Sequence, residues 1–229
     1  MPAEHIIISI TGFSEPFSSL SHLIASGIFL ALGIWLMYRG RSSHARVFAL
    51  AIFVFSVVFL LAMSGVFHLL EPGGTARDVL QRLDHAGIFF LIAGTFTPVH
   101  GILFKRSLRW GMLLFIWTIA VSGIVLKSIY FNDFPEWLSL SLYLGLGWVG
   151  AFSGILLYRR FHFEFIKYLI FGAFAYTIGA VFEFLRTPVL VDGIIGPHEI
   201  FHIFVLFGIS FHFMFIFQFS KKQNIPSRN

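Results

Sequence analysis

The chain has 229 residues, of which 57% are hydrophobic and only 12% are charged, with a mean hydropathy of +0.85. These values exclude an ordinary soluble domain and indicate an integral membrane protein. The formal net charge of +5 does not indicate nucleic-acid binding, because Lys and Arg in a membrane protein gather in the loops that set its orientation.

Seven apolar stretches are each long enough to cross a bilayer, which takes roughly 20 residues. Short connections between them hold most of the charges and the turn-forming residues. We therefore expect an all-α polytopic membrane protein with a single seven-helix transmembrane domain over residues 1–229, a disordered tail at 220–229 and no cleavable signal peptide. The expected helices lie near residues 17–38, 47–70, 82–104, 109–130, 137–158, 165–185 and 198–219.

The basic residues are distributed unevenly between the two sides that seven alternating helices create. The side that holds the first, third and fifth loops and the C-terminal tail carries 12 of the 16 Lys and Arg residues. By the positive-inside rule this side is cytoplasmic, so we expect the N-terminus outside the cell membrane and the C-terminus inside.

Two features within the expected helices concern their packing. Pro98 should kink the third helix and free backbone carbonyls for local polar contacts. Gly150 and Gly154 lie four residues apart in the fifth helix, where missing side chains let a second helix approach closely. Tight packing inside the bundle is favoured over a dimer interface, and the sequence does not decide the oligomeric state.

The seventh expected helix carries His198 and His202 one turn apart on the same face, close enough to bind one ion. Among ten His such a pair arises easily by chance, so the spacing alone decides little. Depth adds to it. His68 ends the second helix and Asp84 begins the third, and the alternation of directions puts both at the same outer end as the pair. Ionisable groups inside spans are costly, so this cluster indicates a functional site.

Chemistry favours zinc at this cluster. The chain has no Cys, so a metal must be held by His, Asp or Glu, and three neutral His nitrogens with an open fourth position are a common donor set of catalytic Zn²⁺. Asp84 would ligate the ion or bind its water, and the Ser64 hydroxyl would reach the site or bond to its own helix. The structural alternatives are His residues that hydrogen-bond between helices and an Asp84 paired with Arg82 or His85.

Other polar residues have weaker signals. His212 lies about 15 Å deeper than His202 by helical rise, too far for the same ion. His22 begins the first helix at the outer end and would support the site from behind the ligands. Glu183 and Glu199 lie at the same end, where each would orient a ligand imidazole or be a solvated helix end.

Three segments carry a resemblance to a known family. "SGVFH" at 64–68, "LDHAGIFFLIAGTFTP" at 83–98 and "HEIFHIF" at 198–204 resemble the signature segments of the hemolysin III family, the prokaryotic branch of the progestin and adipoQ receptor superfamily. The resemblance covers essentially the whole chain. It implies that His68, His198 and His202 ligate zinc, that Asp84 holds the water and that Ser64 supports the site. Ser18 departs from the Asn that the family often shows four residues before His22.

The expected function follows from the site and from the resemblance. Zinc with an open position activates water and polarises a carbonyl, and a site among apolar helices favours a lipid amide or ester as substrate. Alkaline ceramidases are similar in this respect. Two alternatives stay open, a membrane-permeabilising cytolysin or pore and a receptor-like membrane-homeostasis protein with structural zinc. Beyond membrane lipids, the sequence identifies no partner, and animal adiponectin receptors are described with the opposite orientation.

Overall fold

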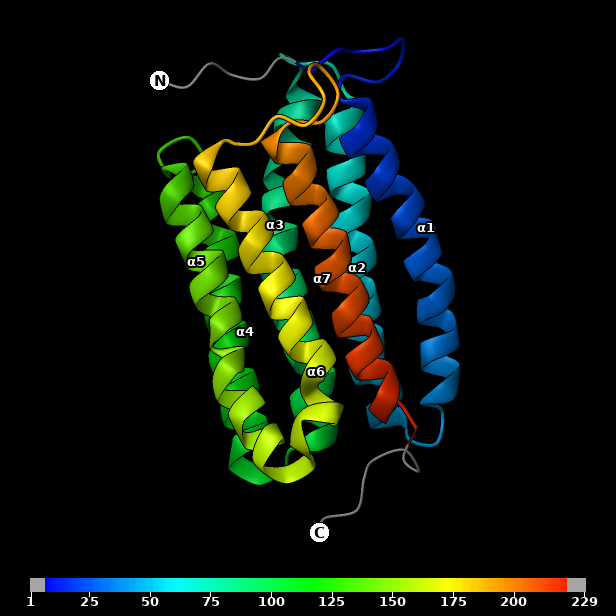
Figure 1. Cartoon of the computed structure of the whole chain (residues 1–229). Helices are drawn as coiled ribbons and strands as arrows, with labels where there is room; N and C mark the ends of the chain where they lie inside the picture. The colour runs from blue at the N-terminus through cyan, green and yellow to red at the C-terminus, as the bar shows by residue number, and fades with distance from the viewer. Residues whose placement is uncertain (1–6, 222–229) are drawn as a thin grey trace.

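The computed structural model describes residues 7–221 and shows an all-helical bundle (Figure 1). Within that range there is no β-strand, only the isolated bridges Ile10–Phe13 and Val191–Ile195. The helices are α1 (Pro16–Arg39), α2 (His44–Leu69), α3 (Thr75–Pro98), the π-helical η1 (Val99–Leu103), α4 (Arg106–Ile129), α5 (Glu136–Trp148), α6 (Gly150–Leu185) and α7 (Pro197–Phe219).

Six helical segments of the described chain are long and apolar enough to cross a membrane, one fewer than predicted. The difference lies in the segment Glu136–Leu185, which is 50 residues long and unites the expected fifth and sixth helices. A straight helix of that length would extend about 75 Å, more than twice the thickness of a bilayer core. The helical backbone is interrupted at His162 (φ 63°, ψ 178°). Figure 1 shows the chain running down through α5 and the first part of α6 and returning upward through the rest of α6.

Other boundaries differ from the prediction for physical reasons. α3 begins at Thr75 rather than near residue 82. Its first two turns are helical but polar, and the prediction relied on apolar residues, so it placed the start of the helix too late. The expected helix over 137–158 is interrupted at Val149, where α5 gives way to α6. After Pro98 the chain continues as a π-helix over Val99–Leu103, in agreement with the predicted local disturbance.

The bundle is held together by two apolar clusters. The larger combines buried side chains of α1, α2, α3, α6 and α7, among them Phe29, Phe53 and Phe215. The smaller joins α3 to α4 and α5 through residues such as Phe89 and Ile116. Many large apolar side chains point outward instead, as expected for a surface that contacts lipid.

Several helices approach one another closely at glycines, but these are not the predicted Gly150 and Gly154. A Cβ at Gly94 of α3 would lie 2.1 Å from the Ser56 Oγ on α2. The corresponding nearest distances at Gly150 and Gly154 are 3.4 and 3.8 Å, which are ordinary contacts inside the bundle. A Cβ at Gly33 of α1 would lie almost as close to Val54 of α2, at 2.2 Å, so close contacts surround α2 on both sides.

The segment before α1 connects the helix ends at the upper end of the bundle in Figure 1. The Ser14 and Glu15 N–H groups donate to the carbonyls of Leu69 and His68 at the end of α2. The Ile8 N–H donates to the carbonyl of Gly193, in the loop that leads into α7, over 2.8 Å. These bonds hold the end of α2 and the starts of α1 and α7 in one layer.

Candidate metal centre

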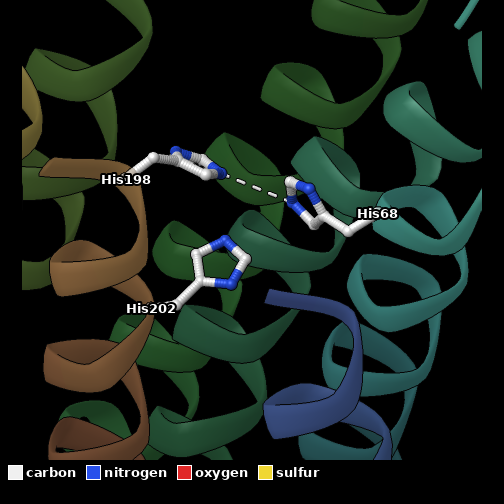
Figure 2. A group of neighbouring side chains, drawn as sticks. All are labelled: His68, His198 and His202. Carbon is white, nitrogen blue, oxygen red and sulfur yellow. Dashed lines mark hydrogen bonds between the residues drawn. The ribbon is translucent and has the colours of Figure 1, made fainter. Parts of the chain in front are cut away.

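Three imidazoles meet where α2 ends and α7 begins. His68 lies in the last turn of α2, and His198 and His202 lie in the first two turns of α7. One ring nitrogen from each residue lies within 4.8 Å of those of the other two. Figure 2 shows the three rings turned towards a common space. The predicted meeting of these residues is confirmed.

The contact between the first two rings has the dimensions of a metal site. The Nε2 atoms of His68 and His198 lie 3.4 Å apart. Two nitrogens held tetrahedrally by zinc, each about 2.0–2.1 Å from the ion, lie about 3.3 Å apart.

The outer nitrogen of His68 is fixed by a carboxylate. Its Nδ1 lies 2.6 Å from the Oε2 atom of Glu15, the residue that precedes α1. An Nδ1–H that donates to this carboxylate leaves the lone pair of the ring on Nε2, where a metal would take it up. Carboxylate support of this kind is usual for His ligands in metalloproteins.

Glu15 is held in turn by Arg77 of α3. The guanidinium pairs with the Oε1 atom of Glu15 and also donates to the carbonyl of Leu70. Burial raises the pKa of Glu15, but the hydrogen bond and charge of His68 and the hydrogen bond from Arg77 outweigh burial and lower that pKa to about 2. A negative Glu15 is therefore in place behind the His68 ring at neutral pH.

His198 has a similar partner on its outer side. Its Nδ1 lies 3.3 Å from the Oε1 atom of Glu183, which also accepts a hydrogen bond from Arg186. When both Nδ1 atoms are protonated, the Nε2 lone pairs of His68 and His198 face one another at 3.4 Å. Two lone pairs at that distance repel unless a cation or a proton lies between them.

The third ring is buried and stacked. His202 is 3% exposed, and its ring lies parallel to that of His22 on α1, with centroids 4.0 Å apart. Figure 2 shows one of its ring nitrogens on the side that faces the other two His. Its Nδ1 has no hydrogen-bond partner among residues 7–221. His22 thus supports a ligand ring from behind, as its position at the outer end suggested.

The two predicted catalytic residues are not among the ring nitrogens that meet at the cluster. Ser64 is buried on α2, one turn before His68. Asp84 is half-buried on α3, and no hydrogen bond or ion pair of its carboxylate is found among residues 7–221. Of its two expected alternative partners, Arg82 donates to the Ser128 carbonyl, whereas the ring of His85, which bonds to the Gln81 carbonyl, also interacts with the charge of Asp84. His85 therefore remains the structural alternative for Asp84.

Glu199 binds the start of α7 and Ser18, whereas Glu183 contacts a His ring. Its Oε1 accepts a hydrogen bond from the Ser18 hydroxyl, and its Oε2 accepts one from the Gly196 N–H, each over 3.0 Å. It caps α7 and ties its first turn to α1. Of the two carboxylates expected to orient an imidazole, only Glu183 contacts one, and Ser18 has a role in placing the ligand helix.

Comparison with known proteins agrees with this geometry. The sequence model of the haemolysin-III-related family matches residues 11–213. The chain belongs to this family. It is 29% identical to Hemolysin-3 of Bacillus cereus over 184 residues, which cover 80% of each chain. It is 32% identical to the Hemolysin-3 homolog of Bacillus subtilis (strain 168), over 69% of this chain and 70% of that one.

A more distant relative extends the family to animals. The human monocyte to macrophage differentiation factor is 24% identical over 203 residues, which are 88% of this chain and 76% of that protein. The hemolysin III resemblance carried by the three sequence segments is therefore confirmed. The haemolysin-III match includes His68, Asp84, His198 and His202, and it includes Glu15, which sequence reasoning missed.

Proposed function

We propose that His68, His198 and His202 hold a zinc ion and that this haemolysin-III-related protein hydrolyses a lipid amide or ester inside the membrane. The observation that supports this most directly is the 3.4 Å separation of two Nε2 atoms whose rings are paired on the outer side with Glu15 and Glu183. A donor set of three His nitrogens is also common in catalytic zinc sites.

A zinc ion bound by three His supplies a Lewis acid for a carbonyl and brings the pKa of water to about 7. Asp84 is the base of the reaction. Its carboxylate would accept a proton from the attacking water and pass it to the leaving amine or alcohol. The Ser64 hydroxyl donates to the carbonyl oxygen as negative charge develops there.

An apolar cavity supports a lipid-like substrate. It measures about 130 Å³ and is lined by Leu60, Ile88 and Phe201, which lie one turn before Ser64, one turn after Asp84 and next to His202. A larger cavity, of about 370 Å³, shares lining residues such as Phe96 with it and extends towards the other end of the bundle. The lining of the smaller cavity is almost wholly apolar and suits an acyl chain whose carbonyl would reach towards the cluster.

The proposal includes the placement of the chain in the cell membrane. Residues 136–185 cross twice, reversing at His162, which gives seven crossings. In Figure 1 α1 starts at the upper end of the bundle and α7 finishes at the lower end, as an odd number of crossings requires. The uneven distribution of Lys and Arg puts the upper end, with the metal centre, outside.

Structural zinc is the competing explanation, because a bound ion would also tie α2 to α7. A group of three His donors favours hydrolysis, since structural zinc usually fills its fourth position with a protein ligand. A pore gains no support from the described bundle, whose interior is filled by the two apolar clusters.

Hydrolysis of ceramide-like amides and esters by the purified protein in lipid nanodiscs tests the proposal. The wild type should turn substrate over, and Asp84→Asn should keep its zinc but lose at least about 100-fold in rate, the usual contribution of a general base. Asp78→Asn, an exposed position on the same helix, is the matched control. Equal turnover in Asp84→Asn removes Asp84 from the mechanism, and zinc-loaded wild type without turnover favours the structural role.

A further inference from the structure

A second polar pair lies at the opposite end of the bundle, away from the His cluster. His100, in η1, and Ser153, in α6, are joined by a 2.8 Å contact between Nε2 and Oγ. Both are almost completely buried, at 0% and 2% exposed. By helical rise His100 lies about 24 Å along the chain axis from Asp84, so the pair cannot share the chemistry of the metal centre.

The hydrogen bonds of His100 determine the direction of proton donation. Its Nδ1 lies 3.0 Å from the carbonyl of Leu108, which accepts but cannot donate. The proton of the neutral ring is therefore on Nδ1, and Nε2 accepts a hydrogen bond from the Ser153 hydroxyl. The rings of Phe96 and Phe104 lie nearly parallel to the imidazole and hold its orientation. A hydroxyl, a base and a group that orients the base are the three parts of an activated serine nucleophile.

Ser153 also lines the larger cavity. This space of about 370 Å³ is within the size range of small-molecule sites. Side chains on its border, such as Trp148, Ile155 and Tyr158, are about half exposed on the surface that faces lipid. An apolar molecule can therefore enter from the bilayer and bring a reactive group to the serine, while His100 remains shielded from the cavity behind it.

We propose that Ser153 is a second, metal-independent nucleophile, activated by His100, that accepts the acyl group of an apolar ester in this cavity. The serine oxygen bonds to the ester carbonyl carbon, and the ester C–O bond breaks. The proton of the serine passes through His100 Nε2 to the departing alcohol. Water then cleaves the acyl-serine, giving a carboxylic acid and the free hydroxyl.

Reaction with a long-chain alkyl fluorophosphonate tests the proposal without knowledge of the natural ester. The serine oxygen displaces fluoride from phosphorus and remains attached, so peptide mass spectrometry locates the adduct. In nanodiscs the wild-type protein should be modified at Ser153, and a chelator should leave the rate unchanged. His100→Gln should slow labelling at least about 100-fold, because the general base is lost.

Matched serines make the result specific. Ser210 on α7 donates to its own helix over 2.7 Å, so Ser210→Ala should label like the wild type, whereas Ser153→Ala should not label. A wild-type protein without an adduct on Ser153, or His100→Gln labelling at the wild-type rate, would reduce the pair to a hydrogen bond between η1 and α6 and overturn the proposal. The decisive measurement is the labelling of Ser153 in the wild-type protein, so a variant that misfolds does not affect the result. The labelling needs no zinc, so it also tests this proposal separately from the proposed zinc-dependent hydrolysis.

Discussion

Glu15 contributes to the metal centre through the geometry of one ring. Its carboxylate fixes which nitrogen of His68 carries the proton and which direction the lone pair points. An uncharged amide of the same shape keeps a hydrogen bond but removes the negative charge that makes the ring a better donor. Partners of this kind typically change metal affinity 10- to 100-fold.

Glu15→Gln should therefore bind zinc about 10- to 100-fold more weakly than the wild type while keeping the fold. Competition with a chromophoric chelator on detergent-purified protein measures the affinity. Glu164→Gln is the control, because that carboxylate is exposed and pairs only with Lys167 on its own helix. An unchanged affinity in Glu15→Gln would show that the contact with His68 has no role in metal binding.

His202 and His212 lie on the same helix, but only His202 belongs to the cluster. The proposed zinc ion would bind the folded state and should raise the melting temperature of the wild type; binding at 100 times the dissociation constant contributes about 2.7 kcal/mol. His202→Ala should lose this zinc-dependent difference and its metal content. His212→Ala should keep both, since its ring bonds to the Leu169 carbonyl away from the site. Elemental analysis and melting with and without chelator provide the measurements.

The meeting of the three His and the contacts of His22 and Glu183 with them were predictable from sequence, but the contact of Glu15 was not. A four-residue spacing places His198 and His202 on one helix face, and alternating helix direction brings His68 to the same depth. Glu15 lies 53 residues before His68 and outside the apolar stretches, so no local pattern connects the two. Their contact depends on how the segment before α1 crosses the end of α2, which is a property of tertiary packing.

At the scale of elements, hydropathy located the apolar stretches but could not define where helices end or approach. The first turns of α3 are polar, so a hydropathy profile does not show that they are helical. The reversal at His162 lies within α6 and not at the end of a helix. The spacing of Gly150 and Gly154 predicted a close approach of two helices there. The structure instead brings Gly94 of α3 into close contact with Ser56 of α2. Which glycine meets a neighbour depends on helix rotation, and composition does not contain that information.

Gly94→Ala should destabilise the bundle by about 1–3 kcal/mol, the usual cost of overpacking. The added Cβ would lie 2.1 Å from Ser56 Oγ and 2.6 Å from its Cβ, and Ser56 is fully buried with its hydroxyl donating to the Phe53 carbonyl. Gly145→Ala, with nothing within 4 Å of the new atom, should be neutral or stabilising. Thermal unfolding of the purified variants gives the comparison. If Ser56→Gly does not recover the loss in the double variant, the α2–α3 contact is not its cause.

For the whole molecule, the number of membrane crossings and the orientation in the membrane are linked, because together they decide on which side each loop lies. Charge asymmetry predicts an outer N-terminus, while the animal relatives that the resemblance names are described the other way round. The opposite ends at which α1 starts and α7 finishes require an odd number of crossings, so locating one end of the bundle relative to the membrane also locates the other. The sequence offers a clean way to decide, because it contains no Cys and any introduced thiol is unique.

Single Cys variants at three exposed positions should therefore report the topology. Glu71→Cys, between α2 and α3, should react with a membrane-impermeant maleimide in intact cells, because it lies at the outer end with the metal centre. Ser42→Cys, between α1 and α2, and Glu164→Cys, after the reversal at His162, should react only after permeabilisation. The opposite pattern at all three would invert the orientation. If Glu164→Cys stayed unreactive on both sides, the segment 136–185 would cross once through the bilayer and the count of seven would be wrong.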